Sequence, residues 1–112
     1  MEQFLKISRA DLKHWMDSGH RFVLVDVTGP SSYHERHLPH AKMVDVHQSY
    51  FVDQVKRLAI DKSTPVVVYC SGYASPLSTQ AAAKLVEAGF THVHEYKGGL
   101  ADWHEGGYPF EK

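Results

Sequence analysis

The amino-acid sequence predicts an α/β fold in which a central, mostly parallel five-stranded sheet carries helices on both faces. Segments of strand character alternate with segments of helical period along the chain, which is typical of a parallel sheet. Residues 22–27 and 65–69 are almost continuously apolar, as expected for strands that are covered on both faces. Because residues 65–69 form the most apolar run, we expect this strand at the centre of the sheet.

Local signals mark the individual elements. Strands are predicted over residues 3–7, 22–27, 41–46, 65–69 and 91–96. Helices are predicted between Ser8 and Ser18, over residues 30–36, 50–58 and 79–88, and in a last segment that carries Trp103 and ends at Gly106. Ser8 is the expected N-cap of the first helix, with the acidic Asp11 three residues later. Gly89 is expected just past the end of the fourth helix.

Composition limits the classes of function that need to be considered. The chain has 112 residues, and we expect residues 1–112 to form a single domain. The formal net charge is −1, so we expect no nucleic-acid partner and no membrane partner. A single cysteine excludes an internal disulfide and a cysteine-based zinc site. A free thiol fits a reducing compartment, no signal peptide is evident, and we therefore expect a cytoplasmic protein.

The single cysteine, Cys70, ends the most apolar strand and opens a loop of small residues that leads into a helix. Ligands of parallel α/β sheets bind beyond the carboxyl ends of the strands, where Asp26 also stands. Backbone N–H groups of the loop and the positive end of the helix dipole would favour the thiolate, which is the reactive form of cysteine. The alternative is a buried, inert cysteine that packs as a small hydrophobic residue.

Four motifs, in order and correctly spaced, resemble those of the rhodanese-like domain family over nearly the whole chain. They are LVDV at residues 24–27, YHERHLPHA at 33–41, VYC at 68–70 with the loop that follows, and GGLADW at 98–103 with GYP at 107–109. The resemblance implies the rhodanese-like fold and sulfurtransferase activity. In that chemistry a cysteine thiolate takes a sulfane sulfur from a donor such as thiosulfate, becomes a persulfide and passes the sulfur to cyanide or a thiol.

The resemblance assigns roles to individual residues. Cys70 would be the nucleophile. Backbone amides of the loop would steady the anionic persulfide. The expected substrate-binding residues are Ser71, Gly72, Tyr73, Ala74, Ser75 and Ser78. Asp26 and His37 are expected in support, Asp26 by orienting a loop, by holding His37 or by capping the next turn. The expected partners are a small-molecule sulfane-sulfur donor or a persulfidated protein and a thiol acceptor, without a cofactor.

Three departures from the family pattern concern the substrate. No basic residue occurs over residues 71–83, so the loop itself carries no cation for thiosulfate. Seven residues separate Cys70 from Ser78, and they include Pro76, which predicts a wider or differently folded loop. Thr28, Arg36 and His40 stand where the family commonly has arginine, glycine and glycine. We therefore expect weak use of thiosulfate and better use of a persulfide donor.

Other functions are weighed against sulfur transfer. Longer loops in this fold resemble those of dual-specificity phosphatases and arsenate reductases, but the arginine that would hold a tetrahedral oxyanion is replaced by Pro76. Nine histidines are many for this length, yet we interpret His37 as part of a turn motif and the others as surface residues, with no metal site. The remaining alternative is a non-catalytic binding module, or one that senses oxidants or sulfane sulfur through Cys70.

Overall fold

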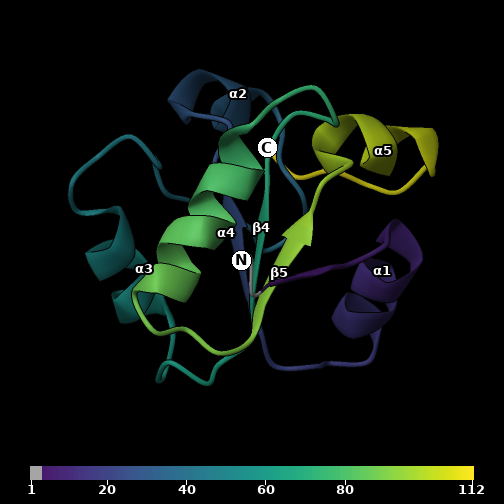
Figure 1. Cartoon of the computed structure of the whole chain (residues 1–112). Coiled ribbons are helices and arrows are strands. Elements are labelled where there is room, and N and C mark those ends of the chain that lie inside the picture. Colours follow the sequence, from purple (N-terminus) through teal and green to yellow (C-terminus); the bar gives the residue numbers. More distant parts are fainter. Residues whose placement is uncertain (1–3) are drawn as a thin grey trace.

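The computed structural model describes residues 4–112, and its sheet and helices form the predicted layers (Figure 1). The strands are β1 (Leu5–Lys6), β2 (Val23–Asp26), β3 (Lys42–Met43), β4 (Val66–Tyr69) and β5 (Val93–Tyr96). The helices are α1 (Arg9–Asp17), α2 (Pro30–Glu35), α3 (Phe51–Leu58), α4 (Leu77–Glu87) and α5 (Gly99–Glu105). All the strand pairs are parallel, and the sheet order β1-β5-β4-β2-β3 places β4 at the centre. The fold class and the central strand are therefore confirmed.

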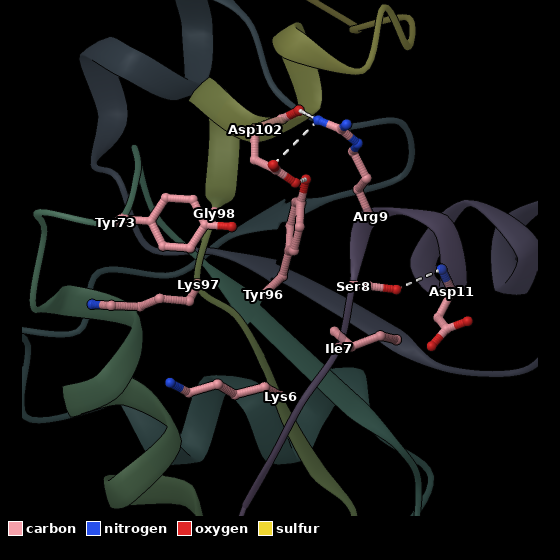
Figure 2. A pocket seen from close by; sticks show the side chains of 10 residues that line it. All are labelled: Lys6, Ile7, Ser8, Arg9, Asp11, Tyr73, Tyr96, Lys97, Gly98 and Asp102. Atoms are coloured by element: carbon pink, nitrogen blue, oxygen red, sulfur yellow. Dashed lines mark hydrogen bonds and ion pairs between the residues drawn. The ribbon is translucent and has the colours of Figure 1, made fainter.

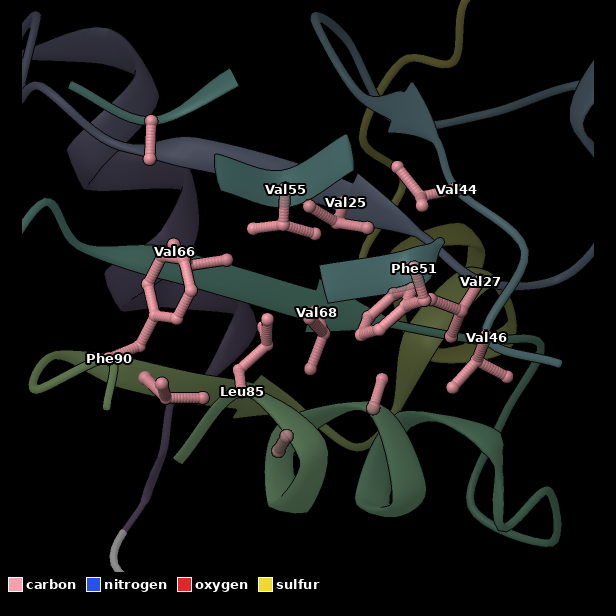
Figure 3. Close-up of a cluster of buried hydrophobic side chains, with 14 of the residues drawn as sticks. Val25, Val27, Val44, Val46, Phe51, Val55, Val66, Val68, Leu85 and Phe90 are labelled. Carbon is pink, nitrogen blue, oxygen red and sulfur yellow. The ribbon is translucent and has the colours of Figure 1, made fainter. Parts of the chain in front are cut away.

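Alternation along β4 divides the core into two clusters. Val66 and Val68 face α3 and α4, where they pack with Phe51 and Leu85 (Figure 3). Val67 and Tyr69 face the other side, with residues of α1 and α5. All four residues of β4 are buried, as the continuous apolar run predicts. The alternation of side chains along β4 therefore decides which helices the residues at the end of the strand contact.

Several boundaries differ from the predicted ones. The first strand is limited to Leu5–Lys6, and the predicted strand residue Gln3 lies outside the described residues. The third strand is only Lys42–Met43, and beyond it one further backbone hydrogen bond, from Val44 N–H to the Asp26 carbonyl at 3.1 Å, joins the predicted run to β2. Helix α4 begins at Leu77, two residues before the predicted start. Over residues 4–112, none of the helices has the length and apolar character needed to cross a membrane.

The predicted helix-end signals are confirmed. The Ser8 side chain accepts a hydrogen bond from the backbone N–H of Asp11, so it caps α1. Gly89 has a positive φ just past α4, a conformation that glycine adopts at little cost.

A buried hydrogen-bond chain joins β4 to β2 on the α1–α5 side of the sheet. The Tyr69 hydroxyl donates to Asp26 Oδ2 at 2.6 Å and accepts from the backbone N–H of Leu38 at 3.1 Å. Burial, together with the neighbouring Asp26 carboxylate, raises the pKa of Tyr69, so the phenol stays protonated. The hydroxyl thereby satisfies two polar groups in a region from which water is excluded.

We expect Tyr69→Phe to lower the free energy of unfolding by about 2 kcal/mol, because it leaves a buried carboxylate oxygen and a backbone N–H without a partner. Denaturant titration of the two proteins would measure the difference. The matched control is Tyr50→Phe at an exposed position, for which a change within about 0.5 kcal/mol is expected. Equal losses in the two variants would contradict the role given to this hydroxyl.

Candidate active site around Cys70

Cys70 directly follows β4 and lies on the side of the sheet covered by α4. Its side chain points to the same face of the sheet as those of Val66 and Val68, and it belongs to the same buried cluster. Its exposed fraction is 0%. The cysteine therefore lies where the sequence predicts it, at the carboxyl end of the central strand, but the loop of residues 71–76 closes over it.

The start of this loop is fixed to the start of α5. The carbonyl oxygens of Cys70 and Ser71 accept hydrogen bonds from the backbone N–H groups of Leu100 (3.1 Å) and Ala101 (3.0 Å). Gly99 makes this approach possible, because a Cβ at that position would overlap the Cys70 carbonyl and because its φ is +56°. The glycine pair in the fourth motif thus anchors the cysteine loop.

The sulfur contacts three of the predicted site residues, through carbonyl and hydroxyl oxygens. Within the described residues, Cys70 Sγ has hydrogen-bond partners in the carbonyl oxygens of Gly72 (3.8 Å) and Ser75 (3.7 Å) and in Ser78 Oγ (3.3 Å). Two of these groups can only accept, so the resting contacts are those of a protonated thiol. No backbone N–H is among these partners of the sulfur, so the expected cradle of amides stays a prediction. Ser75 N–H donates to the Gly72 carbonyl and Leu77 N–H to Ser75 Oγ, and Pro76 has none.

A buried carboxylate, that of Glu95 on β5, extends the contacts of Cys70. Glu95 Oε2 accepts hydrogen bonds from Ser78 Oγ at 2.8 Å and from Thr79 Oγ1 at 2.6 Å. Glu95 is only 1% exposed and Ser78 is fully buried. Ser78 has a single hydroxyl proton, and when it donates to Glu95 its oxygen is free to accept from the thiol.

The sequence analysis missed Glu95, although one signal for it exists. Glu95 stands beside Val68 in the register of β4 and β5, so it points to the same side as Cys70. A charged residue at an inward position of a buried strand is rare unless it is paired, and this one is paired with two hydroxyls.

Lys97, at the end of β5, also reaches the loop. Its Nζ donates to the Ser75 carbonyl at 2.7 Å and lies 3.4 Å from Thr79 Oγ1. The prediction that residues 71–83 supply no cation holds for the loop sequence, but the site does contain one. It comes from a segment that is distant in the sequence and adjacent in the sheet.

The other predicted site residues are divided between the loop and the far side of β4. Tyr73 and Ala74 are exposed at the tip of the loop, and their side chains form no hydrogen bond within the described residues. Asp26 accepts from the backbone N–H (2.7 Å) and the hydroxyl of Thr28, so the turn-capping alternative is the one that the structure contains. His37 Nδ1 contacts the Tyr33 carbonyl at 2.8 Å instead of Asp26.

The histidines do not gather into a metal centre. Among residues 4–112, no group of three or more His, Cys, Asp or Glu side chains is placed to hold a metal ion. His94 corrects the interpretation as a surface residue, because it is half-buried and its ring lies edge-on to Trp15 at 5.1 Å. Burial lowers the pKa of His94, which is the expected direction for an imidazole that loses water.

The fold and the site together define a class: an α/β domain with one cysteine between the central parallel strand and the following helix. The family model that describes the rhodanese-like domain matches residues 8–106. The chain therefore belongs to the rhodanese-like domain family, and the recognition made from the four motifs is confirmed.

Three relatives illustrate the similarity. Thiosulfate sulfurtransferase GlpE of Pseudomonas syringae pv. syringae is 37% identical over 81 residues, which cover 72% of this chain and 71% of the relative. Thiosulfate sulfurtransferase GlpE of Pseudomonas fluorescens is 32% identical over 111 residues, which cover 99% and 94%. The crystal structure of the BH2092 protein from Bacillus halodurans has a TM-score of 0.85 at 30% identity, covering 96% of this chain and 76% of the other.

We expect Glu95→Leu to lower the free energy of unfolding by about 3 kcal/mol, because the hydroxyls of Ser78 and Thr79 lose their shared acceptor. Denaturant titration would measure this loss. The matched control is Glu105→Leu, at an exposed position of α5, where we expect a change within about 0.5 kcal/mol. A Glu95→Leu protein as stable as the control would show that the buried carboxylate does not hold these hydroxyls.

Proposed function

We propose that this protein is a sulfurtransferase that carries a sulfane sulfur as a persulfide on Cys70 and passes it to a thiol or to cyanide. The observation that carries the proposal is the hydrogen-bond chain from Cys70 Sγ through Ser78 Oγ to Glu95 Oε2, at 3.3 Å and 2.8 Å. It couples a candidate nucleophile to a buried proton acceptor. The sulfurtransferase names of relatives at 37% and 32% identity support the same reaction.

The chain of three residues suits the first step, which is formation of the thiolate. The thiol proton moves to Ser78 Oγ while the Ser78 proton moves to Glu95. The buried cluster then keeps one negative charge, now on sulfur, and Ser78 donates to that sulfur instead of accepting from it. A transfer of this kind avoids placing a second negative charge beside the first in a region of low dielectric.

Two transfers of sulfur follow from the thiolate. Cys70 Sγ attacks the sulfane sulfur of the donor, an Sγ–S bond forms, and the electron pair of the broken donor bond leaves with the rest of the donor. An acceptor thiolate then attacks the outer sulfur of the persulfide. The new S–S bond belongs to the acceptor, and the electron pair of the broken Sγ–S bond returns to Cys70.

The loop residues have proposed roles in holding the persulfide. In the closed loop the amides of Ser75 and Leu77 are bonded within the loop, and the carbonyls of Gly72 and Ser75 face the sulfur. An anionic persulfide needs donors in place of these carbonyls. The proposal therefore includes a rearrangement of the loop of residues 71–76 that turns N–H groups toward the sulfur.

A second candidate function is a sensing or binding module with the same fold. Two observations favour it: Cys70 is fully buried, and its sulfur faces a carbonyl oxygen, as the sulfur of a protonated thiol does. Such a thiol would react only when the loop opens. Repeated turnover with a sulfane-sulfur donor and a thiol acceptor distinguishes the two functions. A sensor would take up one sulfur atom and release it slowly, whereas an enzyme would complete many cycles.

We expect Cys70→Ser to abolish sulfur uptake and to leave the thermal midpoint nearly unchanged. Although the site is buried, the neighbours of Sγ are polar, and a serine hydroxyl can donate to the Gly72 or Ser75 carbonyl. Intact-mass measurement after treatment with a persulfide donor would detect a gain of one sulfur atom in the unmodified protein only. Sulfur uptake by the Cys70→Ser protein, or none by either protein, would contradict the proposed function.

We expect Ser78→Ala to slow persulfide formation by about 10²-fold, which is at the low end of what a positioned proton-transfer group contributes. Single-turnover loading, followed by mass, would measure the rate. The matched control is Ser31→Ala on α2, because the Ser31 side chain is exposed, has no hydrogen bond within the described residues and lies outside the site. If both variants load at the rate of the unmodified protein, Ser78 has no part in the proton transfer.

A further inference from the structure

A hydrogen bond from Lys97 to a backbone carbonyl of the loop holds the loop over Cys70. The Ser75 carbonyl lies 3.7 Å from Cys70 Sγ and accepts a 2.7 Å hydrogen bond from Lys97 Nζ. A single oxygen atom therefore lies between the ammonium group and the sulfur. Because Cys70 is fully buried, a donor molecule reaches Sγ only after such loop atoms move aside.

The Lys97 ammonium group has no direct ion-pair partner among the described residues, although Thr79 connects it to the Glu95 carboxylate. Its recorded partners are a carbonyl and the Thr79 hydroxyl, and among residues 4–112 no carboxylate lies within ion-pair distance of its Nζ. Both partners are neutral. An anion is a stronger acceptor for an ammonium group than a neutral carbonyl is, so an anion of suitable size can replace the Ser75 carbonyl.

A pocket on the adjoining surface gives such an anion a place to bind. Its volume is about 570 Å³, and Lys97 and the loop residue Tyr73 both line it (Figure 2). Lys6 adds a second positive charge, and its ammonium group lies on the same side of the pocket as that of Lys97. Two carboxylates also line the pocket: Asp102 is paired with Arg9 at 3.2 Å, and Asp11 lies on the side away from the two lysine ammonium groups (Figure 2).

We propose that Lys97 binds the oxyanion of the sulfur donor, and that this anion takes the place of the Ser75 carbonyl and thereby uncovers Cys70. This inference rests on the proposed function and adds to it a means by which binding of a divalent oxyanion at Lys97 uncovers Cys70. With thiosulfate, Cys70 Sγ bonds to the sulfane sulfur and the donor S–S bond breaks. Its electron pair leaves with sulfite, whose charge Lys97 faces. The weak use of thiosulfate expected from the loop sequence stays a prediction.

The test uses alkylation of Cys70, which requires no sulfur transfer. Iodoacetamide is uncharged, and sulfate serves as an inert divalent oxyanion, compared with chloride at constant ionic strength. The rate is taken on the alkaline plateau of its pH profile, where access to the sulfur, and not ionisation of the thiol, sets the rate. In the unmodified protein we expect a saturable acceleration by sulfate and faster amide hydrogen exchange over residues 71–76.

Variants of Lys97 separate the effect of its hydrogen bond to the Ser75 carbonyl from a general effect of positive charge. Lys97→Met should react about tenfold faster than the unmodified protein without sulfate, because a hydrogen bond to a charged group no longer holds the loop, and sulfate should have no further effect. Lys97→Arg should keep the response to sulfate. The control Lys56→Met removes an exposed cation from α3 and should behave as the unmodified protein.

The outcomes are distinguishable from those for the proposed function. Equal plateau rates for the unmodified and Lys97→Met proteins would overturn the inference, and so would equal acceleration of both by sulfate. If Lys97→Met does not fold, the comparison of sulfate with chloride in the unmodified protein decides, and absence of a saturable effect overturns the inference. Absence of sulfur uptake would instead contradict the proposed sulfurtransferase reaction and leave the alkylation result intact.

Discussion

The burial of β4 on both faces is the constraint on which the rest of this structure depends. A central parallel strand must direct alternate side chains into two separate cores, and its last residues follow the same alternation. Tyr69 consequently points to the α1–α5 side, where its hydroxyl joins Asp26 and Leu38. Cys70 points to the α4 side, toward Ser78. Adjacent residues of the chain thus belong to two different polar clusters, one around Tyr69 and Asp26 and the other around Cys70, the candidate nucleophile.

The polar groups on the α4 side connect protonation with access. The Glu95 carboxylate binds two hydroxyls, one of which contacts the sulfur, and Lys97 binds the carbonyl that covers the sulfur. Thr79 touches both Glu95 and Lys97. The hydrogen bonds at the sulfur and those that hold the loop are therefore connected through Glu95 and Thr79. In this structure the thiol is covered, and the proposed reaction would require both a proton acceptor and opening of the loop.

Prediction from sequence succeeded where a local signal was strong. The apolar run of β4, the Ser8 cap and Gly89 all behave as expected, because each depends on a few neighbouring residues. It was weaker for β1 and β3, which lie at the edges of the sheet and have few residues in register. The expected amide cradle stays a prediction, because no backbone N–H is among the partners of Cys70 Sγ in this conformation and the amides of Ser75 and Leu77 are bonded within the loop.

The sequence by itself determined the fold class, the family and the position of Cys70 at the carboxyl end of the central strand. These features follow from periodicity and from motifs that are contiguous in the chain. Only the tertiary structure decided that Glu95 and Lys97 belong to the same site, and that carbonyls cover the sulfur. The physical reason is the register of β4 with β5, since it sets residues 95 and 97 beside the cysteine loop although more than twenty positions along the chain separate them from Cys70.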